Sequence, residues 1–176
     1  GAGGGPVLLT GAGTTHHFTV DVEEYFHVSA FESHIARWEW ERLESRVALG
    51  VARLLDLLSR HEARATFFVL GWVAERHPAL IRLIANAGHE IGSHGWDHSR
   101  VTAQTSLEFR ESIRRSKQVL EDLVGLPVMG FRAPSFSIVQ GRESALDVLF
   151  VEGYRYDSGL FPHRRPAFGP HAGADD

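Results

Sequence analysis

The chain has 176 residues, 43% of them hydrophobic and 23% charged, which excludes disorder and fibrous repeats and allows one sizeable core. A net charge of −4 provides no field that would attract nucleic acid. The absence of cysteine excludes disulfides and thiol catalysis, so a bound metal would need histidine, carboxylate or other oxygen ligands.

The N-terminal residues 1–16 are rich in glycine, and we expect a flexible lead-in followed by one domain over residues 17–176. No apolar run reaches the length of about 18 residues that a membrane span needs, so none is expected. The segment also lacks the basic flank and apolar stretch of a signal peptide. A cytoplasmic location is the default expectation.

Strand-like and helix-like segments alternate along the rest of the chain. "ATFFVL" is an unbroken apolar run typical of a buried parallel strand, and Thr105 with Glu108 forms a capping box that predicts a helix start. We expect strands over residues 17–21, 65–70, 89–93, 127–132 and 154–158. Between them we expect helices over residues 46–60, 77–88, 105–125 and 144–153.

This alternation predicts an α/β domain with a parallel sheet or barrel. Five strands are too few to close a barrel of the usual size. Residues 159–176 contain no further strand or helix signal. We therefore expect either an open sheet or a chain that stops before the fold does.

Polar side chains follow four of the five expected strands. They are Asp21, Glu23 and Glu24 at the first strand, His94 and His98 after the third, Arg132 at the fourth, and Asp157 with Ser158 at the fifth. The carboxyl ends of parallel strands meet at one edge, where α/β proteins build their sites. The sequence therefore predicts one site made from these side chains.

Two histidines and one carboxylate supply three metal ligands and leave a position open for water. A second carboxylate can act as general base, and an arginine beside that base would keep it ionised. Asp21 together with Glu23 or Glu24 offers the pair of acids. The pattern predicts metal-assisted hydrolysis of an amide or ester, although a lone His-x-x-x-His more often reflects ordinary surface or core histidines.

Four stretches, in order, resemble motifs of the polysaccharide deacetylases that share the NodB homology domain (carbohydrate esterase family 4). They are "TVDVEEYF" (19–26), "SHGWDH" (93–98), "RAPSFS" (132–137) and "YDSGLF" (156–161). The resemblance runs from about residue 18 to about residue 165. The first motif most resembles a branch linked to bacterial exopolysaccharide assembly and protein sorting.

The resemblance implies a distorted (β/α) barrel, incomplete at its C-terminus, and removal of N-acetyl groups from a polysaccharide or oligosaccharide. It implies Asp21 as catalytic base, Arg132 as the partner of that base, and His94 and His98 as ligands of a divalent metal, with zinc favoured. Val22 occupies the position of the family's second aspartate, so the acid ligand must be Glu23 or Glu24, and Glu23 is preferred. Substrate-contact candidates are Glu24, Trp38, Trp96, Pro134, Phe136 and Ser158.

The family's final motif carries a general-acid histidine that an aspartate matching Asp157 orients. No such Leu-x-His stretch occurs before Asp176, so we expect the last strands and that acid to be missing. The aromatic segment 25–45 is a candidate groove wall, or else its rings pack on the next helix. His27 could line that groove, and the default expectation is a surface position.

Two other functions stay open at this point. One is a non-catalytic carbohydrate-binding relative or an inactive fragment, and the other is an amidohydrolase for small cyclic amides. The expected partner is an N-acetylated polysaccharide or oligosaccharide, with no nucleic acid and no membrane span, and the oligomeric state is left open.

Overall fold

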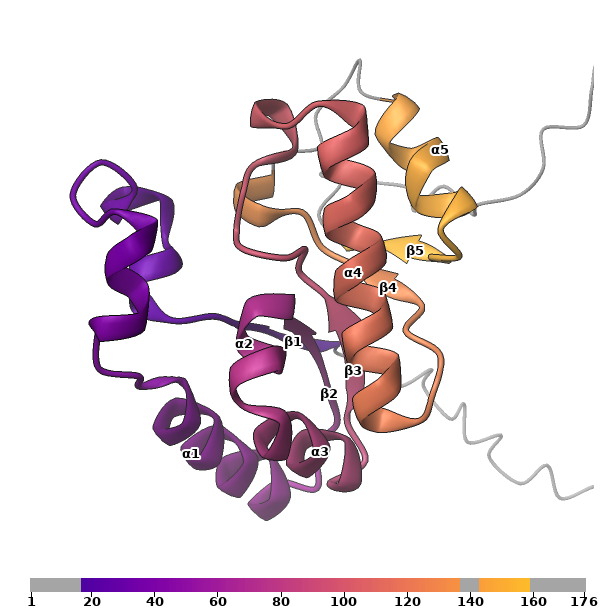
Figure 1. Cartoon of the computed structure of the whole chain (residues 1–176). Coiled ribbons are helices and arrows are strands. Elements are labelled where there is room, and N and C mark those ends of the chain that lie inside the picture. The colour runs from indigo at the N-terminus through magenta and orange to yellow at the C-terminus, as the bar shows by residue number, and fades with distance from the viewer. Residues whose placement is uncertain (1–16, 137–142, 159–176) are drawn as a thin grey trace, which may run out of the picture.

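The computed structural model describes residues 17–136 and 143–158, and its centre is a five-stranded parallel sheet (Figure 1). The strands are β1 (Phe18–Val22), β2 (Ala65–Val69), β3 (Glu90–Ser93), β4 (Gly130–Phe131) and β5 (Tyr156–Asp157). Each strand pairs with the next one in the chain, in the order β1-β2-β3-β4-β5. Winding in one direction is the topology of a (β/α) barrel, since a doubly wound sheet reverses its strand order.

In the described ranges, five α-helices follow the strands and cover one face of this sheet (Figure 1). They are α1 (Val47–Arg60), α2 (Gly71–Arg76), α3 (Pro78–Asn86), α4 (Ser106–Val124) and α5 (Glu143–Val151). The longest, α4, begins at the expected capping box of Thr105 and Glu108 and ends at Gly125, whose φ of 68° is left-handed. Both ends of this helix are therefore set by local sequence, because the box satisfies free amide groups and glycine adopts the left-handed turn without strain.

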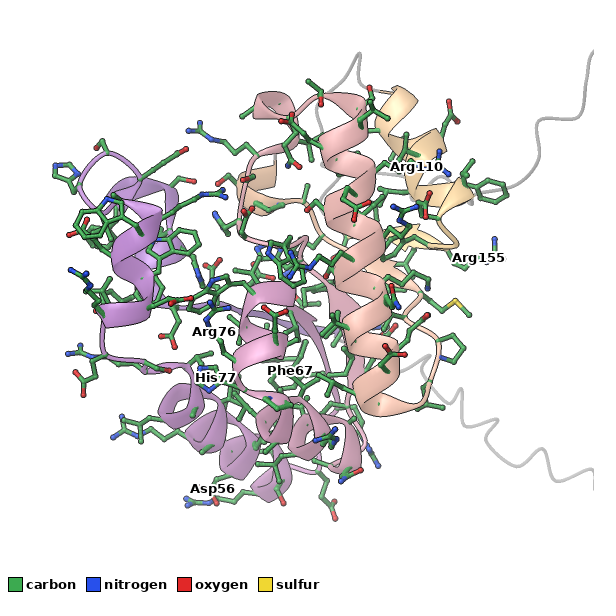
Figure 2. All side chains as sticks on the ribbon, in the orientation of Figure 1. Asp56, Phe67, Arg76, His77, Arg110 and Arg155 are labelled. Atoms are coloured by element: carbon green, nitrogen blue, oxygen red, sulfur yellow. The ribbon has the colours of Figure 1, made fainter. Side chains whose placement is uncertain are left out.

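The core lies between the helices and the sheet. Phe67 on β2 is fully buried there, behind α2 and α3 (Figure 2). The helices contribute the apolar faces that the sequence predicts, with Val51 and Leu58 from α1 and Ile113 and Leu120 from α4 all buried. This packing holds the strand ends in fixed positions.

Contacts of Arg132 show that the sheet curls. Its side chain, directly after β4, donates hydrogen bonds of 2.8 Å to Asp21 Oδ1 and Thr19 Oγ1 on β1. In a flat sheet, β1 and β4 would lie about 14 Å apart, three strand spacings, which is beyond the reach of one arginine. The curvature confirms the predicted barrel-like fold, with the helices on the outside.

The expected elements are confirmed in type, and their ends differ from the expected ranges by a few residues. The strands predicted over 127–132 and 154–158 are shorter than expected, at two residues each. The short helix α2 was not predicted. Segment 25–45 forms three 3₁₀ helices, η1 (Tyr25–His27), η2 (Ser29–Phe31) and η3 (Arg37–Arg42).

The expected lead-in 1–16 and the tail 159–176 lie outside the described residues. Within the described ranges, no helix combines the length and apolar character needed to cross a bilayer.

Candidate metal centre and active site

The loop after β3 turns back on itself and brings His94 and His98 together. Gly95 and His98 both adopt left-handed backbone conformations, with φ of 81° and 62°. The two imidazole rings consequently lie 5.3 Å apart, centroid to centroid. A left-handed histidine is uncommon and costs energy, so this conformation is typical of a functional loop.

Glu23 completes a cluster with these two histidines. Its Oε2 lies 3.0 Å from His98 Nε2 and 3.7 Å from His94 Nε2. One ligand atom from each residue lies within 4.8 Å of the other two. Of the two acids that the sequence left open, Glu23 is the one that lies here.

The chemistry of this cluster fits a divalent cation. Glu23 Oε2 is buried and makes no hydrogen bond of good geometry to any described residue. His94 Nδ1 lies 2.7 Å from the carbonyl oxygen of Arg132, to which it can only donate, so neutral His94 presents an unprotonated Nε2 to Glu23. A backbone carbonyl that fixes the histidine tautomer in this way is typical of metal sites.

Burial and charge shift two pKa values in the cluster. Burial lowers the pKa of the His94 imidazole, which favours the neutral form that binds metals. Burial alone would raise the pKa of Glu23. The hydrogen bond and charge of His98 outweigh this effect, together with the charges that His94 and His27 carry when they are protonated in acid, so the pKa of Glu23 is lowered. Glu23 is therefore ionised and His94 neutral at neutral pH, as metal binding requires.

Asp21 lies at the same end of the sheet, one residue before the end of β1. Arg132 donates to Asp21 Oδ1 at 2.8 Å and to Ser158 Oγ at 2.9 Å. The guanidinium also lies over the ring of Phe68, 4.4 Å from its centroid. Arg132 thus holds the Asp21 carboxylate in one orientation.

Glycine at position 92 makes room for this arrangement. A Cβ added there would lie 2.6 Å from Cδ1 of Phe68, closer than real Cβ contacts. The ring that supports Arg132 therefore depends on a glycine of β3.

Several other predicted site residues lie close to Arg132. Asp157 ends β5 and pairs in register with Phe131 on β4, and Ser158 follows it. Pro134 is buried on η5 (Pro134–Phe136), which follows β4. Phe136 ends η5, and its side chain lies outside the described residues.

Two substrate-contact candidates have other contacts in the structure. Glu24 is 1% exposed. Its carboxylate accepts a hydrogen bond from Ser45 Oγ and another, of 2.9 Å, from the Arg46 amide. The Glu24 carboxylate thus binds the chain just before α1, and its contact with substrate stays a prediction. Trp96 packs between Gly71 and the Arg115 guanidinium, which lies 3.4 Å from a Trp96 ring centroid.

Trp38 remains a candidate, since its side chain is 67% exposed on η3. Its ring contacts the Arg42 guanidinium at 5.3 Å.

The sequence reading missed two features beside the cluster. His27, which we expected at the surface, is 4% exposed and packs against the rings of Trp40 and Trp72. Arg37 on η3 forms an ion pair with Asp97 and holds the histidine loop to segment 25–45. Neither position carries a local sequence signal, because both contacts join residues far apart in the chain.

Comparison with known proteins identifies the family. Residues 48–147 match the sequence profile described as polysaccharide deacetylase. The chain belongs to this family. Its matched region extends from α1 into α5 and contains both histidines and Arg132.

Curated relatives of this polysaccharide deacetylase domain include bacterial peptidoglycan deacetylases. A peptidoglycan deacetylase of Helicobacter pylori is 31% identical over 114 residues, which cover 64% of this chain and 37% of the relative. The peptidoglycan-N-acetylglucosamine deacetylase PgdA of Listeria monocytogenes is 38% identical over 90 residues, which cover 51% of this chain and 19% of the relative. The chain thus spans well under half the length of these relatives.

Solved structures show the same fold. A Mycobacterium smegmatis structure assigned to the polysaccharide deacetylases superposes with a TM-score of 0.67 at 31% identity, covering 82% of this chain and 50% of that one. A family 4 pseudoenzyme from Bacillus anthracis gives a TM-score of 0.60 at 19% identity, and the superposition covers 78% of this chain and 40% of the pseudoenzyme. The second likeness concerns the fold alone, and it shows that this fold also occurs without activity.

Proposed function

We propose that the chain forms the metal-binding part of an enzyme that hydrolyses N-acetyl groups of an N-acetylated polysaccharide or oligosaccharide. The observation that carries this proposal is the cluster of Glu23, His94 and His98 beside the Asp21–Arg132 pair. The names of the Helicobacter and Listeria relatives support N-acetylglucosamine in a polysaccharide as the substrate class. The link to exopolysaccharide remains a prediction from the first motif.

Glu23, His94 and His98 would hold a divalent metal, and zinc suits one carboxylate with two imidazoles, as cobalt, nickel or iron also do. When bound, such a metal supplies a Lewis acid that polarises the amide carbonyl and acidifies water. The His94 tautomer, fixed by the Arg132 carbonyl, keeps Nε2 available for it.

Asp21 is the proposed general base. Its carboxylate takes the proton from the attacking water, and the Arg132 hydrogen bond of 2.8 Å to Oδ1 keeps it oriented. Since Arg132 also binds Thr19 and Ser158, one side chain orders three strands around the base. Asp157 is proposed as a further residue of this site from its place at the end of β5.

The domain is proposed to extend from residue 17 to residue 176, and a cytoplasmic location stays a prediction. A non-catalytic carbohydrate-binding relative is the second candidate function, favoured by the pseudoenzyme of the same fold. An amidohydrolase for small cyclic amides would share the metal centre and differ in substrate.

Two substrates test the proposal with the zinc-loaded chain and the Asp21→Asn variant. An N-acetylglucosamine oligomer tests the complete reaction by acetate release. The aryl ester 4-nitrophenyl acetate has a leaving group that departs without protonation, so it tests the metal and base alone. We expect the wild-type chain to hydrolyse the ester, and we expect the rate to be at least about 100-fold lower in Asp21→Asn. Equal rates in the two proteins would overturn the role of Asp21.

A further inference from the structure

A small cavity lies beside the metal cluster, between segment 25–45 and the loop after β3. Its volume is about 180 Å³, and its lining includes His27, Arg37, Trp40, Asp97 and His98. His98 belongs both to this cavity and to the cluster with Glu23. A ligand in the cavity would therefore lie next to the reacting group.

His27, which lines this cavity, carries a buried hydrogen-bond donor. The Glu24 amide donates to His27 Nδ1 at 2.9 Å, so that nitrogen is unprotonated and the proton of the neutral ring is on Nε2. Burial lowers the pKa of His27 to about 4, which keeps the ring neutral at physiological pH. The Nε2–H group is buried and has no hydrogen-bond partner among the described residues.

Trp40 brings a second donor of the same kind. Its ring lies 4.5 Å from that of His27, and its Nε1–H group is likewise buried without a hydrogen-bond partner in the described part of the chain. Buried N–H groups without partners are rare in folded proteins because leaving them unsatisfied is costly. Two of them on residues that line one cavity indicate a ligand with acceptor oxygens.

The charges around the cavity favour a neutral ligand. Arg37 is paired with Asp97, and Glu32, which also lines the cavity, is paired with Arg100 at 2.8 Å. A phosphate or uronate would therefore find no unpaired cation among these groups, and would meet two carboxylates. The aromatic rings of Trp40 and Phe26 suit the apolar face of a sugar.

We propose that this cavity is a subsite for one neutral sugar ring of the substrate, with His27 Nε2–H and Trp40 Nε1–H donating to its hydroxyl or acetamido oxygens. The volume is below the range of pockets for larger ligands and suits a single ring. The inference rests on the proposed function, because it takes the ligand to be the polysaccharide that reaches His98.

The experiment titrates the zinc-loaded full chain with the neutral N-acetylglucosamine tetramer. Calorimetry gives Kd, and the indole N–H resonance of Trp40 is followed by NMR in the wild-type protein. The variants are Trp40→Phe, which removes one N–H, and His27→Asn, which keeps an acceptor for the Glu24 amide but loses Nε2–H. The matched control is Trp72→Phe, because Trp72 packs in the same aromatic cluster without lining the cavity.

We expect the Trp40 indole resonance to move on tetramer addition. Each variant should weaken binding about 3- to 10-fold, as for loss of one hydrogen bond between neutral groups, while Trp72→Phe binds like the wild type. An acidic oligogalacturonate of equal length should bind more weakly than the neutral tetramer.

An unmoved indole resonance, folded variants that bind as tightly as the wild type, or a wild type that does not bind the tetramer would overturn the subsite. The wild-type resonance tests it even where a variant fails to fold. If the chain shows this binding pattern but hydrolyses neither the N-acetylglucosamine oligomer nor 4-nitrophenyl acetate, the proposed function is contradicted and the subsite stands.

Discussion

Replacing His27 should change how the stability of the protein depends on pH. The folded protein holds the pKa of His27 at about 4, against an ordinary value of 6.5, because the imidazole is buried. Between these two values the unfolded chain binds a proton that the folded chain does not, so the free energy of unfolding falls as the pH falls below 6.5. Linkage puts this loss at about 2 kcal/mol between about pH 7.5 and about pH 5.

The assay is urea unfolding at both pH values, in the presence of a chelator, for the wild type and His27→Asn. The variant should be less stable at neutral pH, since it leaves space in an aromatic cluster, but its loss on acidification should be smaller by about 2 kcal/mol. His34→Asn changes an exposed histidine of the same segment and serves as control. Parallel losses in wild type and His27→Asn would refute the buried neutral imidazole.

Three further substitutions test the frame around the site, each by urea unfolding against the wild type. Arg132→Gln should cost about 2–3 kcal/mol because its bonds join β4 to β1 and β5, and an unchanged midpoint would contradict this linkage. Gly92→Ala should cost about 1–3 kcal/mol through its clash with Phe68, whereas Gly50→Ala on α1, which meets nothing within 4 Å, should stabilise by about 0.5–1 kcal/mol. Thr105→Ala should cost about 1 kcal/mol as the capping box is lost, and no loss would mean that tertiary packing alone holds the start of α4.

Features with a local sequence signature were predicted correctly. The ends of α4 depend on a capping box and a glycine, and both stand in the sequence next to the helix they limit. The meeting of Asp21, His94 and Arg132 at one edge follows from parallel strands alone, since their carboxyl ends point the same way. The short helix α2 was missed because six residues hold less than two turns of periodicity.

Features that depend on contacts between distant residues could not be predicted. Glu23 and Glu24 are adjacent, and Glu24 has extended backbone, in which neighbouring side chains point to opposite sides. One therefore reaches the histidines and the other the Arg46 amide, and the sequence alone does not show which side each element lies on. His27 is polar and its segment is aromatic, so its burial became visible only with Trp40 and Trp72 packed around it.

The central claim is that Glu23, His94 and His98 bind one divalent cation, and zinc content per chain tests it most directly. We predict one equivalent after zinc loading and gel filtration in the wild type and in Glu24→Gln. Glu23→Gln and the double variant His94→Ala/His98→Ala should lose it. Unchanged zinc in the double variant, or loss in Glu24→Gln with retention in Glu23→Gln, would contradict the assignment of these ligands.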